Sequence, residues 1–286
     1  MIAGGLLAAC GGSGDGPGPS KPPPPPVTTA TILAAGDVGM CGFGALDTGR
    51  LIDALGGTLL PLGDLAYLHG TLQDFRDCYD PGWGRHMERS RPVPGNHEYE
   101  TPGAAGYFDY FGLFAGQRGA GYYTFTAGPW KIFALNSEIS MAPGSTQVQW
   151  LRDELQNSNH TCTLAYWHRP LFSSGQNGNN PDTRALWTTL IEFGADVVLN
   201  GHDHIYERFE PQDDQGRLDP VRGLRQFTVG TGGARLTSPG APKPNSVVRS
   251  GASYGVIQMT LNVNSYSWEF KSVNNSFSDS GAGTCR

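Results

Sequence analysis

The stretch DVVLNGHDH, residues 196–204, joins a short apolar run to two histidines that are one residue apart. A short apolar run that ends in a turn signal is typical of a buried strand in a central sheet. The polar residues that follow would lie at the carboxyl end of that strand, which is where open α/β sheets bind ligands. Taken alone, this stretch fits either an ordinary polar loop or a metal site.

Four further runs share this design, each an apolar segment that ends in a turn or a histidine. They are TILAAGD at 31–37, TLLPLGD at 58–64, RPVPGNH at 91–97 and CTLAYWH at 162–168. The five ends carry only oxygen and nitrogen ligands, namely Asp37, Asp64, Asn96 with His97, His168, and His202 with His204. Such ligands suit iron, manganese and zinc. Each motif alone is weak, but five strand ends of one kind predict a metal site.

Helical patterns separate several of these runs. Apolar residues recur with helical spacing in 44–55, 145–156 and 182–193, and Ser145 and Asp182 are the expected N-caps of the second and third. Segments with strand character and tight turns dominate the C-terminal part. We therefore predict an α/β fold in which two mixed β-sheets pack together and are flanked by helices.

Composition narrows the class of protein. The chain has 286 residues and a net charge of -6, with no basic block, so we expect no nucleic acid polymer as a partner. No apolar run of about 18 residues occurs, and we expect no transmembrane helix.

The N-terminus indicates export. Residues 1–9 resemble a lipoprotein-type signal segment, and the small residues before Cys10 predict cleavage and lipidation at that cysteine. The alternatives are an ordinary secretory signal or a misassigned start, because the usual basic residues are missing. Residues 10–26 read as a Gly/Pro-rich linker and 27–286 as the folded domain. We expect a cell-envelope lipoprotein held by its lipid alone, or a periplasmic or extracellular protein.

The motifs of the chain resemble those of a known family. The chain's motifs are GDVG (36–39), GDLAY (63–67), GNHE (95–98), YWH (166–168) and GHDH (201–204). They are similar to the five blocks of the calcineurin-like metallophosphoesterases. The tyrosine in GDLAY and the ending GHDHIYER (201–208) resemble the purple acid phosphatase branch, especially its bacterial secreted members. The resemblance spans roughly residues 31–208, and it implies the αββα sandwich of that family with 27–286 as the catalytic domain.

The resemblance implies a dinuclear metal site. The first metal would be Fe(III), and its ligands would be Asp37, Tyr67 and His204. The second would be Zn, Fe or Mn, with Asn96, His168 and His202 as ligands. Asp64 would bridge the two, and a shared carboxylate is what two nearby cations need to reduce their mutual repulsion.

The resemblance also implies a reaction. A metal-bound hydroxide would attack the phosphorus of a small phosphorylated substrate, as in an acid phosphatase that cleaves phosphomonoesters. His97 would contact the phosphoryl group or protonate the leaving oxygen, unless it is only a turn histidine. Glu98 would orient His97. Arg169 would steer the anionic substrate or form a structural ion pair.

One departure leaves other functions open. Plant and animal members of the branch carry extra histidines shortly after the block that holds His168, and RPLFSSGQNGNN (169–180) has none. A phosphodiesterase acting on nucleotides or glycerophosphodiesters is therefore the main alternative. An alternative of another class is a catalytically silent binding lipoprotein, although all seven ligand positions carry permitted residues. The sequence implies no particular oligomeric state.

Four cysteines remain once Cys10 is set aside, and in an exported protein an even set indicates disulfides. The sequence alone allows three pairings. The metal loops that the resemblance implies favour Cys41–Cys78, since both would lie near one rim, and Cys162–Cys285, which would tie down the C-terminus.

Overall fold

The structure is a computed structural model that describes residues 1–2, 4–5 and 28–286. The predicted lipidation site Cys10 and the linker 10–26 lie outside the described residues. Every helix in the described part of the chain is too short or too polar to cross a lipid bilayer.

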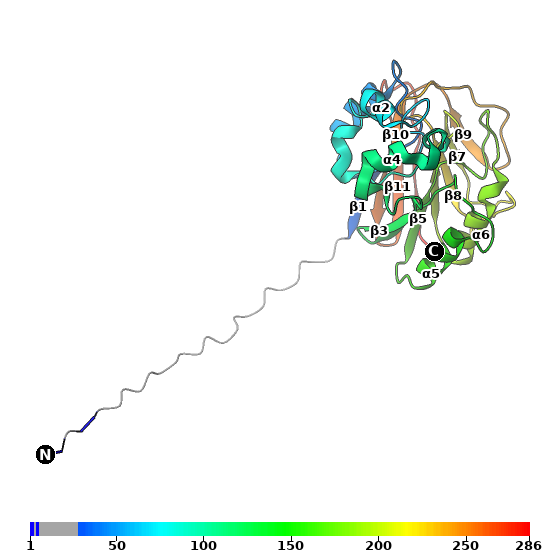
Figure 1. Ribbon diagram of the computed structural model, residues 1–286. Coiled ribbons are helices and arrows are strands. Elements are labelled where there is room, and N and C mark those ends of the chain that lie inside the picture. Colours follow the sequence, from blue (N-terminus) through cyan, green and yellow to red (C-terminus); the bar gives the residue numbers. More distant parts are fainter. Residues whose placement is uncertain (3, 6–27) are drawn as a thin grey trace.

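Two mixed β-sheets form the body of the protein (Figure 1). The first has the strand order β12-β11-β10-β1-β2, and the second has the order β3-β4-β5-β6-β8-β7-β9. The strands of the first sheet are β1 (Thr29–Ala35), β2 (Thr58–Pro61), β10 (Gly255–Asn262), β11 (Ser265–Ser272) and β12 (Ser280–Thr284). Those of the second are β3 (Tyr123–Ala127), β4 (Trp130–Ala134), β5 (Cys162–Tyr166), β6 (Val197–Asn200), β7 (Tyr206–Phe209), β8 (Arg225–Val229) and β9 (Ser246–Ser250).

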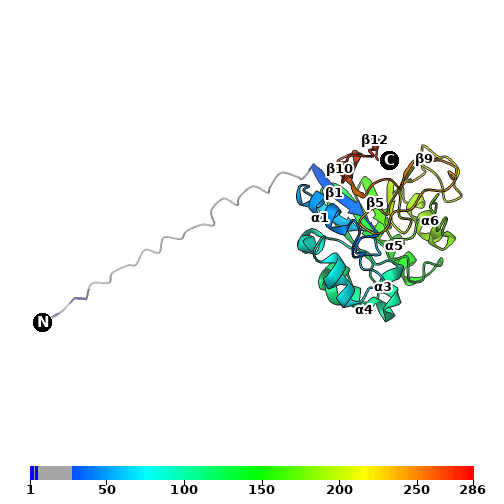
Figure 2. The same cartoon turned by 90° about the horizontal axis from the view of Figure 1, so that it is seen from above.

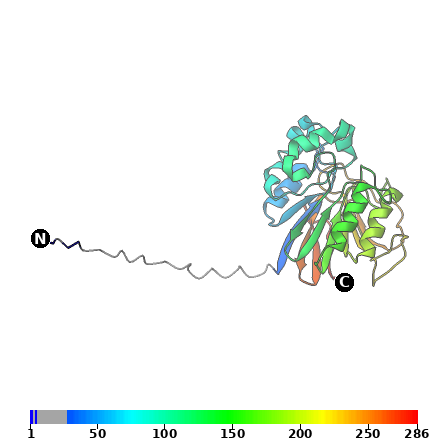
Figure 3. The same ribbon diagram turned by 60° about the horizontal axis from the view of Figure 1, so that its bottom comes forward.

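In the described part of the chain, six α-helices flank the sheets. They are α1 (Ala45–Asp53), α2 (Leu72–Asp74), α3 (Asn96–Glu100), α4 (Ala105–Phe111), α5 (Thr146–Gln156) and α6 (Arg184–Glu192). Seen from above, α1 lies near β1 and β10, while α3 and α4 lie together (Figure 2). The helices α5 and α6 cover the outer face of the seven-stranded sheet (Figure 3). The predicted fold of two packed mixed sheets with flanking helices is therefore confirmed.

Alternation along the strands of the seven-stranded sheet divides the core in two. Ile132 and Ala134 of β4 point into the core between the two sheets. Phe133 and Leu135 point the opposite way, into the core beneath α5 and α6. Successive side chains of a strand face opposite sides, so a strand that is apolar throughout must be covered on both faces. This explains why the runs in β5 and β6 are continuously apolar.

The helix boundaries follow local capping. The Ser145 hydroxyl accepts a hydrogen bond from Val148 N at the start of α5, as predicted. Asp182 is not the cap of α6. Instead, the Asn180 side chain accepts a bond from the backbone N–H of Asp182 and begins a short 3₁₀ turn before the helix. Pro181 favours this earlier start, because it fits the first position of a helical turn.

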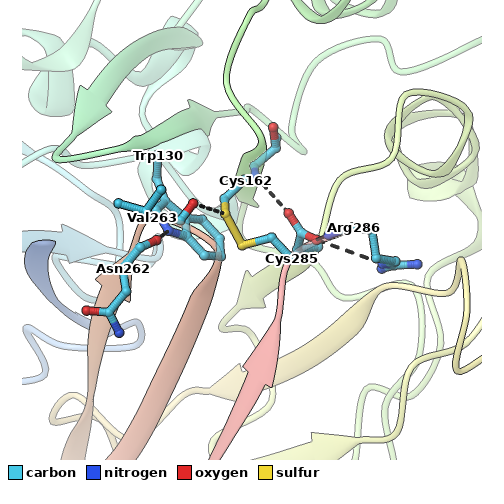
Figure 4. The surroundings of a disulfide bond; sticks show 8 residues. Trp130, Cys162, Asn262, Val263, Cys285 and Arg286 are labelled. Atoms are coloured by element: carbon cyan, nitrogen blue, oxygen red, sulfur yellow. Dashed lines mark hydrogen bonds and ion pairs between the residues drawn. A yellow bond between two sulfur atoms is a disulfide. The ribbon is translucent and has the colours of Figure 1, made fainter. Parts of the chain in front are cut away.

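Both predicted disulfides are present. Cys41 pairs with Cys78, and Cys162 at the start of β5 pairs with Cys285 just after β12 (Figure 4). The second bond joins the two sheets covalently across 123 residues of chain.

The buried carboxylate of Asp196 bonds to both chain segments that the second disulfide joins. Asp196 accepts hydrogen bonds from the backbone N–H groups of Thr163 and Arg286, each of which directly follows one of the bonded cysteines. Burial raises the pKa of Asp196 from 3.8 to about 6, although these two donors and the Arg286 charge oppose the increase.

This raised pKa predicts a pH-dependent stability. The folded protein binds more protons at Asp196 than the unfolded chain does between pH 3.8 and 6. The free energy of unfolding should therefore fall as the pH rises through this window, by about 3 kcal/mol for this group. Asp196→Asn should remove that part of the slope. Denaturant unfolding at several pH values, with the exposed Asp153→Asn as control, measures it. An unchanged slope in Asp196→Asn would contradict the prediction.

Candidate metal centre

The predicted ligands lie at one edge of the molecule, because the strands that precede them run in parallel. β1 pairs in parallel with β2, and β5 pairs in parallel with β6. The carboxyl ends of these strands lead to Asp37, Asp64, His168 and the pair His202 and His204. The fifth motif ends at the start of α3, where Asn96 is the first residue.

The first predicted ligand group is compact. The Tyr67 hydroxyl lies 3.0 Å from Asp37 Oδ1 and 3.1 Å from His204 Nε2. His204 Nε2 lies 3.3 Å from Asp37 Oδ1. A phenol, a carboxylate and an imidazole therefore converge on one point, with their ligand atoms facing each other.

The second predicted group lies beside it. His202 Nδ1 is 3.2 Å from His168 Nε2. Ligand atoms of Asp64, His168 and His202 all lie within 4.8 Å of one another, which is the spacing of residues that can hold one ion. Asn96 contributes a buried Oδ1 that has no hydrogen-bond partner among the described residues.

Asp64 lies between the two groups. Its Oδ2 is 3.1 Å from His168 Nε2 and 3.4 Å from the Tyr67 hydroxyl. Its Oδ1 accepts a bond from the backbone N–H of His97. Glycine is required at position 95, because a Cβ there would collide with the Asp64 carboxylate.

Backbone carbonyls fix the orientation of the His168 and His204 rings. His168 Nδ1 donates to the Leu62 carbonyl at 2.9 Å, and His204 Nδ1 donates to the Arg235 carbonyl at 2.8 Å. In both rings Nε2 is then directed at the carboxylates, His168 at Asp64 and His204 at Asp37. This carbonyl-to-histidine support is typical of metal-ligating histidines.

Three of the candidate ligands have left-handed backbones. Asp37, Asp64 and His202 adopt φ values of 59°, 52° and 73°. Such conformations cost about 1–3 kcal/mol each and persist where the surroundings enforce them, often at functional sites. The strand ends therefore hold their side chains against a local conformational preference.

The electrostatics of the site favour a cation. Burial opposes ionisation of Asp64, yet neighbouring His168 holds the pKa of Asp64 below its ordinary value. Burial opposes protonation of His168, but the Asp64 carboxylate raises the pKa of His168 to about 10. Burial and the charge of His168 lower the pKa of His202 to about 3. A metal cation would replace the His168 proton, since metal binding releases protons from its ligands.

The ionisation of Tyr67 is also affected by burial and by the nearby carboxylates. Burial and the carboxylates of Asp37 and Asp64 raise the pKa of the Tyr67 hydroxyl well above 10. A phenolate at this position therefore needs a cation that outweighs both carboxylates. The donor set fits a metal pair on these grounds. The buried Asn96 Oδ1, which has no hydrogen-bond partner in the described ranges of the chain, is suited to be a metal ligand.

Glu98 has a different role from the one expected. It is fully buried and accepts four backbone N–H bonds, from Asp64, Leu65, Ala66 and Gly95. The expectation that Glu98 orients His97 is therefore wrong. The carboxylate points away from that ring because the N–H groups of two loops converge on it.

His97 is oriented by the backbone instead. Its Nδ1 donates to the Leu68 carbonyl at 2.5 Å, and its ring lies against Tyr67 with centroids 4.3 Å apart. Its Nε2 is 3.8 Å from Asp64 Oδ2, and the side chain is 27% exposed. The free nitrogen thus faces the candidate metal centre from the solvent side.

Arg169 forms the structural ion pair considered for it and also lies at the edge of the site. Its Nε donates to Glu138 Oε1 at 2.9 Å, which is a structural ion pair. Its Nη1 lies 3.3 Å from His202 Nε2, at the edge of the site.

Several residues that complete the site belong to no motif in the sequence. The candidate metal centre opens into a cavity of about 260 Å³ that Gln176, Asn177 and Thr237 also line. Asn177 is held in place, since its side chain donates to the His202 carbonyl and its backbone N–H to Asp203. Gln176 and Asn177 lie in the segment 169–180, which contains no histidine.

Comparisons with known proteins agree with this geometry. The sequence model of the family described as calcineurin-like phosphoesterase matches residues 30–206. Purple acid phosphatase 15 of Arabidopsis thaliana is 30% identical over 242 residues, which cover 71% of this chain and 45% of that protein. The Fe(3+)-Zn(2+) purple acid phosphatase 12 of the same plant is 26% identical, with coverage of 70% and 50%.

A solved structure shares the fold. The purple acid phosphatase from yellow lupin seeds superposes with a TM-score of 0.75 at 18% identity, covering 91% of this chain and 55% of the lupin chain. The chain thus spans about half the length of the curated relatives it matches. Since the family model covers more than half of the chain, including all the candidate ligands, this protein belongs to the calcineurin-like phosphoesterase family.

Proposed function

We propose that the protein is a dinuclear metal-dependent phosphoric ester hydrolase that acts on phosphomonoesters. The observation that carries this proposal is the place of Asp64, whose carboxylate touches both ligand groups. Membership of the phosphoesterase family supports hydrolysis of phosphoric esters. The relatives named as purple acid phosphatases support a monoester as the substrate.

We further propose which ions bind. The group of Asp37, Tyr67 and His204 would hold Fe(III), since a phenolate oxygen suits a hard, highly charged cation. The group of Asn96, His168 and His202 would hold Zn, Fe or Mn. A relative named as an Fe(3+)-Zn(2+) enzyme supports this assignment. When bound, the metal pair would supply Lewis acidity to the phosphoryl oxygens and acidify the attacking water.

The chain's own residues would do the rest. Asn96 is a neutral oxygen donor, so it adds no negative charge that would repel a phosphate. His97 presents Nε2 to the mouth of the centre and would donate a proton to the leaving oxygen. Arg169, next to His202, would attract the anionic substrate. Gln176 and Asn177 can donate hydrogen bonds but cannot serve as acids near neutral pH.

This absence of a second acid favours a second candidate function. In the described cavity, amides lie at the rim next to His97. A diester with a good leaving group depends less on protonation, so the same centre would also suit a phosphodiesterase. We regard a silent binding protein as the third reading, which the complete ligand set opposes.

We also propose export and attachment through a lipid on Cys10, with 27–286 as one catalytic domain. The two disulfides support an oxidising compartment. Mass spectrometry of the N-terminal peptide would detect the lipid.

Hydrolysis assays test the reaction. The purified protein loaded with iron and zinc or manganese should cleave p-nitrophenyl phosphate faster than bis-p-nitrophenyl phosphate. Asp64→Ala should reduce the rate at least about 10³-fold and bring bound metal, measured by elemental analysis, close to zero, because both ions lose a ligand. Asp153→Ala is the exposed control. A faster diester rate would favour the phosphodiesterase, and an active Asp64→Ala would place the site elsewhere.

A second prediction concerns His97. His97→Ala should keep both metals but lower kcat about 10²-fold, as expected for loss of a general acid. The decrease should be smaller for esters whose alcohols are strong acids, because they leave without a proton. His160→Ala, an exposed histidine outside the site, should match the unmodified protein. Equal rates for His97→Ala and His160→Ala would reduce His97 to a turn residue.

A further inference from the structure

A second, larger cavity lies beside the candidate metal centre. It measures about 1010 Å³, whereas the cavity at the metal centre measures about 260 Å³. Three segments form it, namely the loop 137–144, the N-terminal half of α5, and residues 180–189 that lead into and include part of α6. We call it the α5–α6 groove. Its size matches sites that hold drug-sized molecules, whereas the smaller cavity falls below the usual volume of such sites.

Arg169 connects the two cavities. Its side chain lines the α5–α6 groove, and its Nη1 lies 3.3 Å from His202, which lines the metal cavity. The ion pair with Glu138 and a bond from Arg169 N to the Ser137 hydroxyl hold it in this place. A molecule whose phosphate sits at the metal centre therefore meets the groove within the length of one side chain.

The lining of the groove is mainly apolar at its base. Met141 and Val148 are buried there, with 7% and 5% of their surfaces exposed, and Ala185 of α6 lies in the opposite wall. Hydrogen-bonding side chains, among them Gln149 and Thr188, lie along the groove as well. The composition suits a flat apolar ring with a few polar atoms at its edge.

Three arginines and two carboxylates line the groove, and two of the three arginines have carboxylate partners. Arg169 pairs with Glu138, and Arg152 forms two short bonds to Glu192. Charges that already have partners give little attraction for a second strongly charged group. The groove therefore favours an uncharged organic part of a ligand over another phosphate.

We propose that the α5–α6 groove binds the alcohol portion of the substrate, which is a phosphate ester of a bulky, partly apolar alcohol that carries a planar ring. Aryl and nucleoside alcohols have this chemistry, whereas glycerol does not. This proposal rests on the proposed function for the position of the phosphate. It adds a substrate class that the metal ligands alone do not define.

Binding of non-hydrolysable phosphonates tests the groove without relying on turnover. Titration calorimetry of the metal-loaded protein should give a dissociation constant at least about tenfold lower for 2-naphthylmethylphosphonate than for methylphosphonate, because only the former buries a ring. Gln149→Trp, at an exposed position of α5 that lines the groove, should fill the groove and remove this preference. Gln156→Trp, on the same helix but outside the groove, should retain it. Ala185→Trp fills the groove from α6 and should act like Gln149→Trp.

Each outcome has a distinct meaning. Equal binding of the two phosphonates by the unmodified protein would overturn the proposal, and so would a preference that survives both groove-filling variants. A third outcome is that the unmodified protein prefers the naphthyl phosphonate, the groove-filling variants lose this preference, and p-nitrophenyl phosphate is not hydrolysed. This outcome would support the groove and refute the proposed hydrolase. Hydrolysis of p-nitrophenyl phosphate without any preference between the phosphonates would support the proposed hydrolase and refute the groove.

Discussion

The arrangement of the candidate site depends on the buried carboxylate of Glu98. It accepts four backbone N–H groups, three from residues 64–66 after β2 and one from Gly95 before α3. Burial and the nearby Asp64 charge raise the pKa of Glu98 to about 7, despite the bonds that Gly95 and Ala66 donate. Two loops from different parts of the chain are thereby held together, and Asp64 and Asn96 are brought to one place. Loss of such a bonded buried carboxylate leaves several donors without partners, each costing about 1–3 kcal/mol.

The residues that follow the strands then supply most of the candidate ligands. Parallel strands deliver the side chains to one edge, and left-handed backbones at Asp37, Asp64 and His202 redirect them inward. Backbone carbonyls select the ring nitrogens of His168 and His204. The Asp64 carboxylate and the protonated His168 ring stabilise each other's charges, and a metal cation would take the place of the His168 proton.

Much of the architecture could be predicted from the sequence because it depends on local patterns. Four of the five apolar runs with turn signals are strands, whereas residues 91–97 form only an isolated bridge at Val93 before α3 begins. Ser145 indicated where α5 begins. The ligand types were visible as motifs, and the disulfides followed from where the motifs lie. Other features depend on three-dimensional packing that no local pattern encodes. Glu98 was assigned the wrong partner because the direction of a buried side chain depends on which N–H groups converge around it. The α5–α6 groove forms between a loop and two helices that are far apart in the sequence, and Gln176 carries no motif.

The most direct test of this account is anomalous X-ray diffraction from crystals of the metal-loaded protein at the iron and zinc or manganese edges. We predict two peaks, with iron beside Asp37, Tyr67 and His204 and the second metal beside Asn96, His168 and His202, and the Asp64 carboxylate contacting both. A single peak, or peaks remote from Asp64, would contradict the central claim that this carboxylate joins two metal sites.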